Sequence, residues 1–291
     1  MPRDVVVREL LAEAQSLLAA GPHPDRARQD AETLLLQAWG RQYPERNHAW
    51  LLTHLDSHAA PGNAAEFHAL VKRRLAGEPI QYIAGETEFY GLPFSVTRDV
   101  LIPRPETEHL VEKALQFSAE LADPRIVDVG TGSGAIAVAL ATHLSKVSIT
   151  ATDISSAALA IARRNAQRNQ VADRIRFVAG DLLAPVVGEQ FEMVVSNPPY
   201  VAEADRGTIA IEVREFEPEA ALFAGSDGLS VYRRLITAAH DTLAAGGILL
   251  LEIGYGQQNA VGALLESAGF GDIEFTADLQ GIPRVVTGRR P

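Results

Sequence analysis

Short apolar runs alternate with amphipathic stretches from residue 125 onward, and this order restricts the fold more than any other feature of the sequence. The apolar runs have the length of buried strands, and the stretches between most of them have helical periodicity. Strands joined in this way lie parallel in one sheet, with helices on both faces. The sequence therefore predicts an α/β fold. Strands are expected at 126–129, 147–153, 175–179, 191–196, 247–253, 273–275 and 284–287, and helices from about 135, at 155–169, at 229–243 and at 257–268.

The first 105 residues have a different organisation. Residues 1 to about 80 predict helices, among them 27–39, closed by Gly40, and 63–76, ended by Gly77. Residues 88–96 predict two extended pieces around a Gly-Leu-Pro turn. Prolines on both sides of Arg104 then exclude a helix until Pro105 or Thr107 opens one that runs to about Ser118. We predict a helical domain over 1–80, a hairpin linker over 81–105 and a catalytic domain over 106–291.

Composition excludes several classes of protein. The chain has 291 residues, no cysteine and a net charge of −11, so thiolate metal sites are excluded and a phosphate-binding surface is disfavoured. A local basic face remains compatible with this charge. His54 and His58 stand four residues apart without a third ligand, so no metal is expected. No apolar run reaches the ~18 residues of a membrane span, and the first residues do not resemble a signal peptide. We expect a cytoplasmic protein that is a monomer.

A glycine-rich string over Val127–Gly134 follows a predicted strand and opens a helix. Glycines at such a turn let the backbone approach a ligand, because no Cβ stands in the way. Asp128 is placed to accept from an ammonium group or a bridging water. Asp153 ends the next strand, 19 residues after Gly134, where an acid can accept from both hydroxyls of a ribose. A plain strand–helix turn and a dinucleotide site are the alternatives.

The spacing of the glycines favours a cofactor without phosphates. Gly-x-Gly-x-Gly departs from the G-x-G-x-x-G pattern that holds a pyrophosphate. S-adenosylmethionine (AdoMet) has no phosphate and carries a sulfonium charge, so acidic surroundings suit it. Asp181 follows Gly180 after the third strand and is in place for the adenine amino group, although an ordinary turn aspartate fits the pattern equally well.

Asn197-Pro198-Pro199-Tyr200 follows the fourth strand directly. Its prolines predict a rigid loop at the carboxyl end of the sheet, where open α/β folds bind ligands. The Asn197 side-chain oxygen and the Pro198 carbonyl are acceptors that can hold both N–H bonds of an NH₂ group. Tyr200 offers a flat face to a planar substrate. No titrating base is evident, so catalysis would rest on positioning. A simple β-turn is the alternative.

Further sequence motifs are spread over nearly the whole chain. They are Glu78–Ile83 with Gly85, Phe89–Gly91, Leu101–Glu108, Glu215–Pro218 with Gly228 and Leu229, Glu252–Gly254, and Gly281–Arg284. With these motifs, the glycine-rich turn and Asn-Pro-Pro-Tyr, the sequence resembles the release factor glutamine N5-methyltransferases, called PrmC or HemK. Leu101–Glu108 is the most family-specific motif, whereas Asn-Pro-Pro-Tyr occurs also in nucleic-acid adenine methyltransferases.

This resemblance implies a fold and an activity. The fold would be a small N-terminal helical domain that docks the protein substrate, a β-hairpin linker and a seven-stranded Rossmann-like class I methyltransferase domain. The activity would be methylation of the glutamine in the Gly-Gly-Gln motif of class I peptide chain release factors, the proteins of translation termination. AdoMet would be the methyl donor and S-adenosylhomocysteine the product.

The resemblance also implies the roles of individual residues. Asn197, Pro198 and Tyr200 would be catalytic, and Pro199 would join them in lining the glutamine pocket. Leu182 stands where some members place an aromatic ring against adenine. The residues that would bind AdoMet are Asp128, Gly130, Thr131, Gly132, Ser133, Gly134, Asp153, Asp181, Leu182 and Asn197.

Several charged residues keep two interpretations. Arg104, Glu106 and Thr107 either line a cleft between domains or stiffen the linker and cap a helix. Acids at 215 and 217 either face a basic partner or are solvated surface, and Arg284 is expected to pair with a buried carboxylate.

Two other functions use the same features. An adenine-N6 methyltransferase would share the Asn-Pro-Pro-Tyr loop but needs a flipped base and a basic channel, which the charge of −11 disfavours. A non-catalytic AdoMet-binding scaffold is disfavoured by the intact glycine turn and by Asn197.

Overall fold

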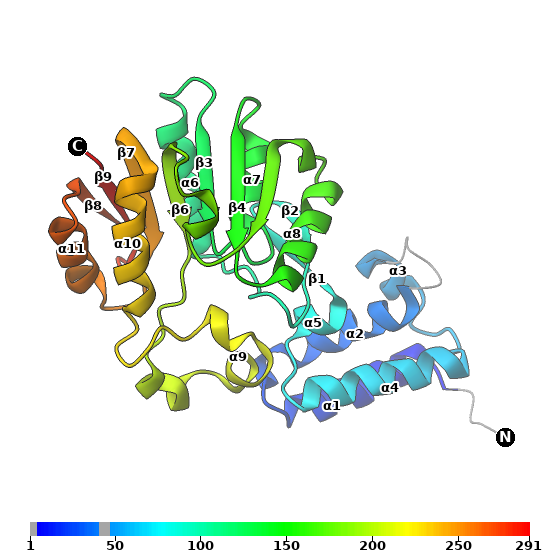
Figure 1. The fold of residues 1–291 in the computed structure, drawn as a ribbon. Helices are drawn as coiled ribbons and strands as arrows, with labels where there is room; N and C mark the ends of the chain where they lie inside the picture. Colours follow the sequence, from blue (N-terminus) through cyan, green and yellow to red (C-terminus); the bar gives the residue numbers. More distant parts are fainter. Residues whose placement is uncertain (1–4, 41–46) are drawn as a thin grey trace. The chain divides into compact units, whose positions relative to one another are not determined.

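The computed structural model describes residues 5–40 and 47–291, and the chain divides into two compact units (Figure 1). Unit 1 comprises Met1–Gly85 together with Ile211–Phe216. Unit 2 comprises Glu86–Ala210 and Glu217–Pro291. The short segment over Ile211–Phe216 lies between two stretches of unit 2 in the sequence and yet packs as part of unit 1.

Unit 1 is helical, as its apolar spacing predicts. Leu10, Leu34 and Phe67 are among the buried residues of its core, which forms as the helices bring their apolar faces together. Helix α2 ends at Gly40 and α4 ends just before Gly77, whose φ of +90° a residue with a side chain rarely adopts. The helices are α1 (Val7–Ala19), α2 (Ala27–Gly40), α3 (His48–Thr53), α4 (Pro61–Leu75), α5 (Ile80–Ala84) and α9 (Ile211–Phe216).

A buried arginine ties α9 to the rest of unit 1. The Arg74 side chain on α4 is 2% exposed and donates to Asp30 of α2 at 2.6 Å and to Glu212 of α9 at 3.1 Å. It also donates to the Glu78 carbonyl at 3.0 Å. His23 lies 3.0 Å from the same Glu212 carboxylate. Polar contacts, rather than apolar packing alone, therefore hold α9 in this unit.

The predicted hairpin opens unit 2. It is formed by β1 (Glu86–Phe89) and β2 (Leu92–Ser95). The prediction of a Gly-Leu-Pro turn is wrong, because Phe89 pairs with Leu92 and the turn is therefore Tyr90-Gly91. Both turn residues have positive φ, 53° and 70°, which matches the twist of a two-residue hairpin. Residues 80–84, which overlap the start of the predicted linker, are helical.

A seven-stranded sheet forms the centre of unit 2, with the strand order β5-β4-β3-β6-β7-β9-β8. The first five strands in this order are parallel, and β9 and β8 are antiparallel to their neighbours, so the predicted mostly parallel sheet is confirmed. The strands are β3 (Arg125–Val129), β4 (Ser148–Asp153), β5 (Ile175–Ala179), β6 (Phe191–Ser196), β7 (Leu243–Glu252), β8 (Gly271–Ala277) and β9 (Pro283–Arg289).

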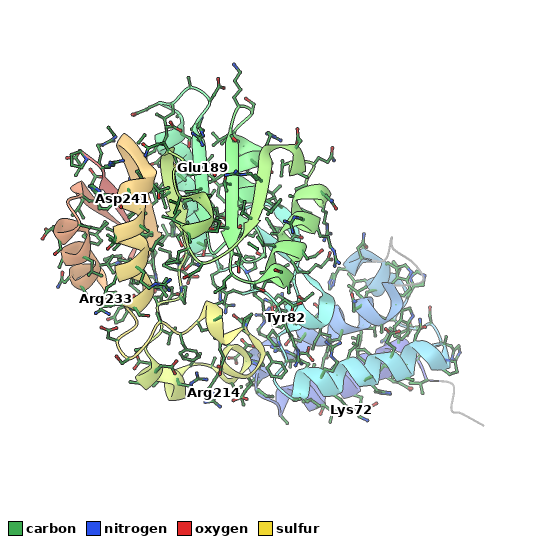
Figure 2. All side chains as sticks on the ribbon, viewed as in Figure 1. Lys72, Tyr82, Glu189, Arg214, Arg233 and Asp241 are labelled. Atoms are coloured by element: carbon green, nitrogen blue, oxygen red, sulfur yellow. The ribbon has the colours of Figure 1, made fainter. Side chains whose placement is uncertain are left out.

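Helices cover both faces of this sheet, as predicted (Figure 1). Along β3, Ile126 packs into one core and Val127 into the other, as the alternation of side chains across a strand requires. Charged side chains such as Arg233 and Asp241 lie on the exposed face of α10 (Figure 2). One face holds α6 (Thr107–Ser118), α7 (Ala135–His143), α8 (Ser156–Arg168) and the hairpin, and the other holds α10 (Ser230–Thr242) and α11 (Gln258–Ser267).

Within the described ranges, no helix is both long enough and apolar enough to span a bilayer.

Candidate active site

The carboxyl ends of the parallel strands bring most of the predicted site residues to one edge of the sheet. The glycine-rich turn follows β3, Asp153 ends β4, and Asn197 follows β6. Because these strands are parallel neighbours in the order β4-β3-β6, the three features lie next to one another. This is the edge at which open α/β sheets bind ligands.

The turn after β3 needs its glycines for conformation. Gly130, Gly132 and Gly134 have φ of +71°, +55° and +81°. A Cβ at Gly134 would also lie 3.1 Å from Ala162 of α8, so this residue sets how closely the turn approaches that helix. A Cβ at Gly130 would meet nothing within 4 Å, so this backbone borders open space. Thr131 and Ser133 between them are buried.

Asp153 braces this turn from the neighbouring strand. Its Oδ2 accepts from the Gly132 N–H at 2.8 Å, and its Oδ1 accepts from the Ser155 N–H at 2.8 Å. The side chain is partly exposed, so lone pairs remain for a ligand hydroxyl. The next residue, Ile154, is 69% exposed and adds an apolar side chain at this edge of the sheet.

Asp128 lies inside the protein, behind the turn. It is 0% exposed, and its Oδ2 accepts from Thr131 Oγ1 at 2.6 Å and from the Ala137 N–H at 3.2 Å. Its Oδ1 accepts no hydrogen bond from the residues that the structure describes. Burial raises the pKa of Asp128 to about 7. In this structure the carboxyl holds the turn against α7. The contact predicted for Asp128, with an ammonium group or a bridging water, stays a prediction.

Asp181 and Leu182 lie at the end of β5. Asp181 is exposed and forms an ion pair with Arg234 of α10. Leu182 has φ of +49°, and its carbonyl accepts from Thr152 Oγ1 at 2.9 Å, which fixes the backbone to the end of β4. Both residues line a hollow of about 330 Å³ that also includes Val187. The adenine contact predicted for this pair stays a prediction.

Asn197 is hydrogen-bonded into the protein at the sheet edge. Its Nδ2 donates to Thr107 Oγ1 at 3.0 Å, and Thr107 Oγ1 donates to Glu252 Oε2 at 2.6 Å. Thr107 and Glu252 are 4% and 2% exposed, whereas Asn197 is partly exposed. Burial raises the pKa of Glu252 to about 7, against the hydrogen bond from Thr107, which lowers it. Since Nδ2 is committed inward, Asn197 Oδ1 is the atom left to accept from a substrate.

Tyr200, which follows the two prolines, is tightly packed. A Cβ at Gly228 would lie 2.4 Å from the Tyr200 carbonyl, and one at Gly254 would lie 2.8 Å from its ring. Gln257 Nε2 donates to the same carbonyl at 3.0 Å. Burial raises the pKa of Tyr200 to about 12, so its hydroxyl stays protonated at neutral pH and does not serve as a base. Pro198 is buried and Pro199 partly exposed.

Some predictions for the charged residues are wrong. Glu217, interpreted as solvated surface or a site for a basic partner, has a side chain 1% exposed and accepts from Arg104 Nη2 at 2.6 and 2.7 Å. Thr107 does not cap α6; it is the first helical residue and bonds Glu252 instead. Arg284 pairs with Asp278 at 2.9 Å, a carboxylate that is only partly buried. Glu215 is exposed beside Arg214, as a surface acid would be.

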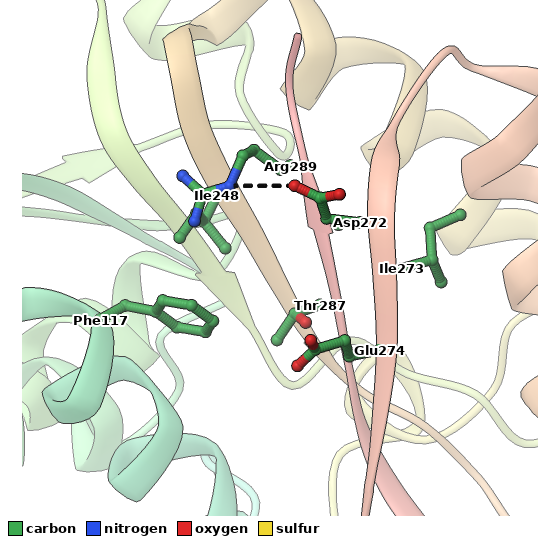
Figure 3. Close-up of a pocket in the computed structure, with 8 residues that line it drawn as sticks. Phe117, Ile248, Asp272, Ile273, Glu274, Thr287 and Arg289 are labelled. Atoms are coloured by element: carbon green, nitrogen blue, oxygen red, sulfur yellow. Dashed lines mark ion pairs between the residues drawn. The ribbon is translucent and has the colours of Figure 1, made fainter.

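A separate cavity of about 320 Å³ lies on β7, β8 and β9 (Figure 3). It contains an ion pair between Asp272 and Arg289 at 3.5 Å, and Phe117 of α6 lies beside it. Phe117 stands ten residues beyond Thr107 on α6, about 15 Å along the helix axis. No predicted site residue lines this cavity, so it is not the candidate active site. No cluster of metal ligands occurs in the described part of the chain.

Comparison with known proteins connects this geometry to a family. Residues 107–220 match the family model of the methyltransferase small domain, and residues 9–85 match that of the PrmC N-terminal domain. Among solved structures, a methyltransferase of Pyrococcus furiosus gives a TM-score of 0.52 at 19% identity, over 69% of this chain and 90% of that one. The 16S rRNA methyltransferase RsmC of T. thermophilus gives 0.54 at 16% identity, over 71% of this chain and 50% of that one. These similarities establish the fold alone.

The fold and the site therefore define a methyltransferase with a seven-stranded sheet. The release factor glutamine methyltransferase of Burkholderia pseudomallei is 43% identical over 285 residues, which are 96% of this chain and 97% of that one. That of Cereibacter sphaeroides is 42% identical over 284 residues, or 97% of each chain. The protein belongs to the release factor glutamine methyltransferase family.

Proposed function

We propose that this protein transfers a methyl group from AdoMet to the N5 amide nitrogen of the Gly-Gly-Gln glutamine in class I peptide chain release factors. The observation that carries the proposal is the orientation of Asn197. Its Nδ2 is held by Thr107, so its Oδ1 is left as an acceptor for the substrate, and the Pro198 carbonyl of the next residue would be the second acceptor. Two acceptors on a rigid loop match the two N–H donors of a primary amide.

The residues at the turn fit AdoMet as the methyl donor, which supplies a methyl group on a positively charged sulfur. Gly130 exposes backbone with open space beside it, and Asp153 keeps lone pairs for ribose hydroxyls. Ile154 gives an apolar face on which adenine can lie. Asp128 would act through the turn that it holds rather than by contact. The G-x-G-x-x-G motif that binds a pyrophosphate does not occur in this turn.

Positioning supplies the catalysis in this proposal. The two acceptors hold the amide so that its nitrogen lone pair points at the methyl group. Positive charge moves to the nitrogen as the new N–C bond forms and the S–C bond breaks, and Asn197 Oδ1 and the Pro198 carbonyl stabilise that charge through the N–H bonds. The nitrogen then releases one proton to water. Tyr200 covers the planar amide as a neutral phenol.

Mass spectrometry of methyl transfer tests the proposal. A purified class I release factor and unmethylated duplex DNA are offered separately with AdoMet. We expect one methyl group on the Gly-Gly-Gln glutamine and a loss of roughly 10²–10³ in rate for Asn197→Ala. Asn169→Ala, on an asparagine that follows α8 outside the site, is the matched control. Methylated adenine, or AdoMet binding without any transfer, would refute the proposed substrate.

The partner and its docking also belong to this proposal. We propose that the helical unit docks the release factor, that the enzyme works as a monomer in the cytoplasm, and that no nucleic acid binds directly.

A further inference from the structure

Three sequence strings that lie far apart in the chain meet in one chain of hydrogen bonds. Thr107 begins α6, Asn197 follows β6 and Glu252 ends β7. Ser196 and Leu251 are paired in the parallel register of β6 and β7, so the residues after them lie side by side at the sheet edge. The Thr107 hydroxyl accepts from Asn197 Nδ2 at 3.0 Å and donates to Glu252 Oε2 at 2.6 Å.

The direction of these bonds determines which atom of Asn197 faces the substrate. A carboxylate only accepts, so an ionised Glu252 requires the Thr107 hydroxyl to donate toward it. The Thr107 oxygen is then an acceptor for Asn197, which must turn Nδ2 inward and Oδ1 outward. A flipped Asn197 would present its own NH₂ to the NH₂ of the substrate, and two donors do not bind each other.

We propose that Glu252 is a positioning residue that acts through Thr107 to hold the Asn197 amide in its acceptor-outward orientation. The inference rests on the proposed function, because it concerns how that site holds an amide. It gives one shared role to Thr107, Asn197 and Glu252, which come from three separate sequence motifs.

The surroundings of Glu252 make this arrangement sensitive to pH. Burial and the charge of Glu106, which precedes α6, raise the pKa of the carboxyl, whereas the Thr107 and Asn197 side chains and the charge of Arg284 lower it. The Tyr200 phenol stays neutral beside it. The buried Tyr232 hydroxyl donates to the Glu252 backbone carbonyl at 2.8 Å, not to the carboxylate. A protonated Glu252 can donate to Thr107 and so reverse the bond direction. Because the pKa of Glu252 is raised to about 7, turnover is expected to fall as pH decreases through this value.

The test compares Thr107→Val, which keeps the side-chain shape but removes the hydroxyl, with Thr107→Ser, which keeps the hydroxyl. We expect kcat to fall roughly ten- to hundredfold in Thr107→Val, from the loss of one buried hydrogen bond. We expect it to recover to within about threefold of wild type in Thr107→Ser. Thr242→Val removes a buried hydroxyl bond on α10, where Thr242 donates to the Ala238 carbonyl, and is the matched control.

Glu252→Gln supplies a second test that does not depend on Thr107 variants folding. Its side-chain oxygen still accepts from Thr107 but does not titrate, so the acid limb of the kcat profile should disappear. An acid limb at the same pH in Glu252→Gln would overturn the inference. So would wild-type kcat in Thr107→Val, or an equal loss in Thr242→Val.

Nuclear magnetic resonance separates this inference from the proposed substrate. The side-chain NH₂ of ¹⁵N-labelled Asn197 should exchange slowly with water in the wild type and faster in Thr107→Val, with no release factor present. Protected NH₂ signals without methylation of any release factor would refute the substrate but keep the positioning network. Equal exchange in wild type and Thr107→Val would refute the network whatever the substrate is.

Discussion

Replacing Arg74 by Met tests whether buried charge pairing holds unit 1 together. Arg74 and Asp30 are each 2% exposed on their side chains and are joined at 2.6 Å, while Glu212 is 32% exposed. Met has nearly the length of the arginine stem and no charge, so the substitution leaves the buried Asp30 with only the half-exposed Arg26, whose Nε lies 3.7 Å from Asp30 Oδ1. Asp30 can then keep its charge only at the cost of poor solvation.

The expected magnitude follows from this burial. Removing one partner of a buried ion pair costs up to about 3–5 kcal/mol of the free energy of unfolding when the other charge stays uncompensated, and Arg26 compensates Asp30 only from a longer distance and a half-exposed side chain. The loss of the bond to Glu212 adds less, since an exposed pair contributes about 0–1 kcal/mol. Arg28→Met is the matched control on α2: Arg28 is 77% exposed and pairs with Glu32 four residues away, and we expect it to cost about 0.5 kcal/mol or less.

Tryptophan fluorescence in urea measures unit 1 by itself. The chain has two tryptophans, Trp39 and Trp50, and both lie in unit 1. For Arg74→Met, we expect the urea midpoint of the fluorescence transition to fall by roughly 2–3 M with an unchanged slope. A double variant that also carries Asp30→Leu should regain part of the loss, because an apolar pair of similar volume avoids the buried charge.

An Arg74→Met midpoint that matches Arg28→Met would refute the reasoning, because burial would then not determine the cost of breaking the pair. A double variant less stable than Arg74→Met would refute the electrostatic explanation and favour simple loss of packing.

Two further predictions concern unit 2. Asp153→Ala should weaken AdoMet binding by roughly ten- to hundredfold, measured by calorimetry, because it removes the ribose acceptor and the bond that braces Gly132; an unchanged affinity would exclude Asp153 from the cofactor site. Burial raises the pKa of Asp128 and Glu252 to about 7 from 3.8 and 4.5, so the folded state holds more protons than the unfolded state between about pH 4 and 7. The free energy of unfolding should therefore fall as pH rises through this window, by up to about 3 kcal/mol for Glu252, and level off above pH 7. Denaturation followed by circular dichroism should show a smaller fall in Glu252→Gln than in the wild type. An equal fall would assign the titration to another group.

The fold was predictable from sequence wherever one local pattern determined an element. Buried strands such as β3 and β6 are apolar runs followed by turn residues, and α2 and α4 have clear helical spacing with glycine at or just after their ends. The shortest helices were not predicted individually. Helices α3, α5 and α9 have 6, 5 and 6 residues, too few for a periodic signal, and tertiary contacts such as those of Glu212 hold α9.

The site was predictable to the level of its loops but not of its contacts. The glycine turn, Asp153 and Asn197 lie together because strand ends meet at one edge, which topology alone implies. The partners of Asn197 and Arg104 are 90 and 113 residues away, and no local pattern indicates them. One signal was available for Glu252: it is an acid that directly ends the apolar run Ile248–Leu251, where a buried carboxylate needs a partner.

The acceptor pair at Asn197 and Pro198 would suit the amine of adenine as well as a glutamine amide, so selectivity must come from other groups. Capture of a flipped base requires cations that hold the phosphates beside it. The two arginines whose charge reaches Tyr200 are Arg104 and Arg284, and each is already paired, with Glu217 and with Asp278. Neutralised in this way, they hold loops in place rather than offering a phosphate site. The pairing of these two arginines supports the proposal that the Asn-Pro-Pro-Tyr loop takes a protein amide rather than a nucleobase.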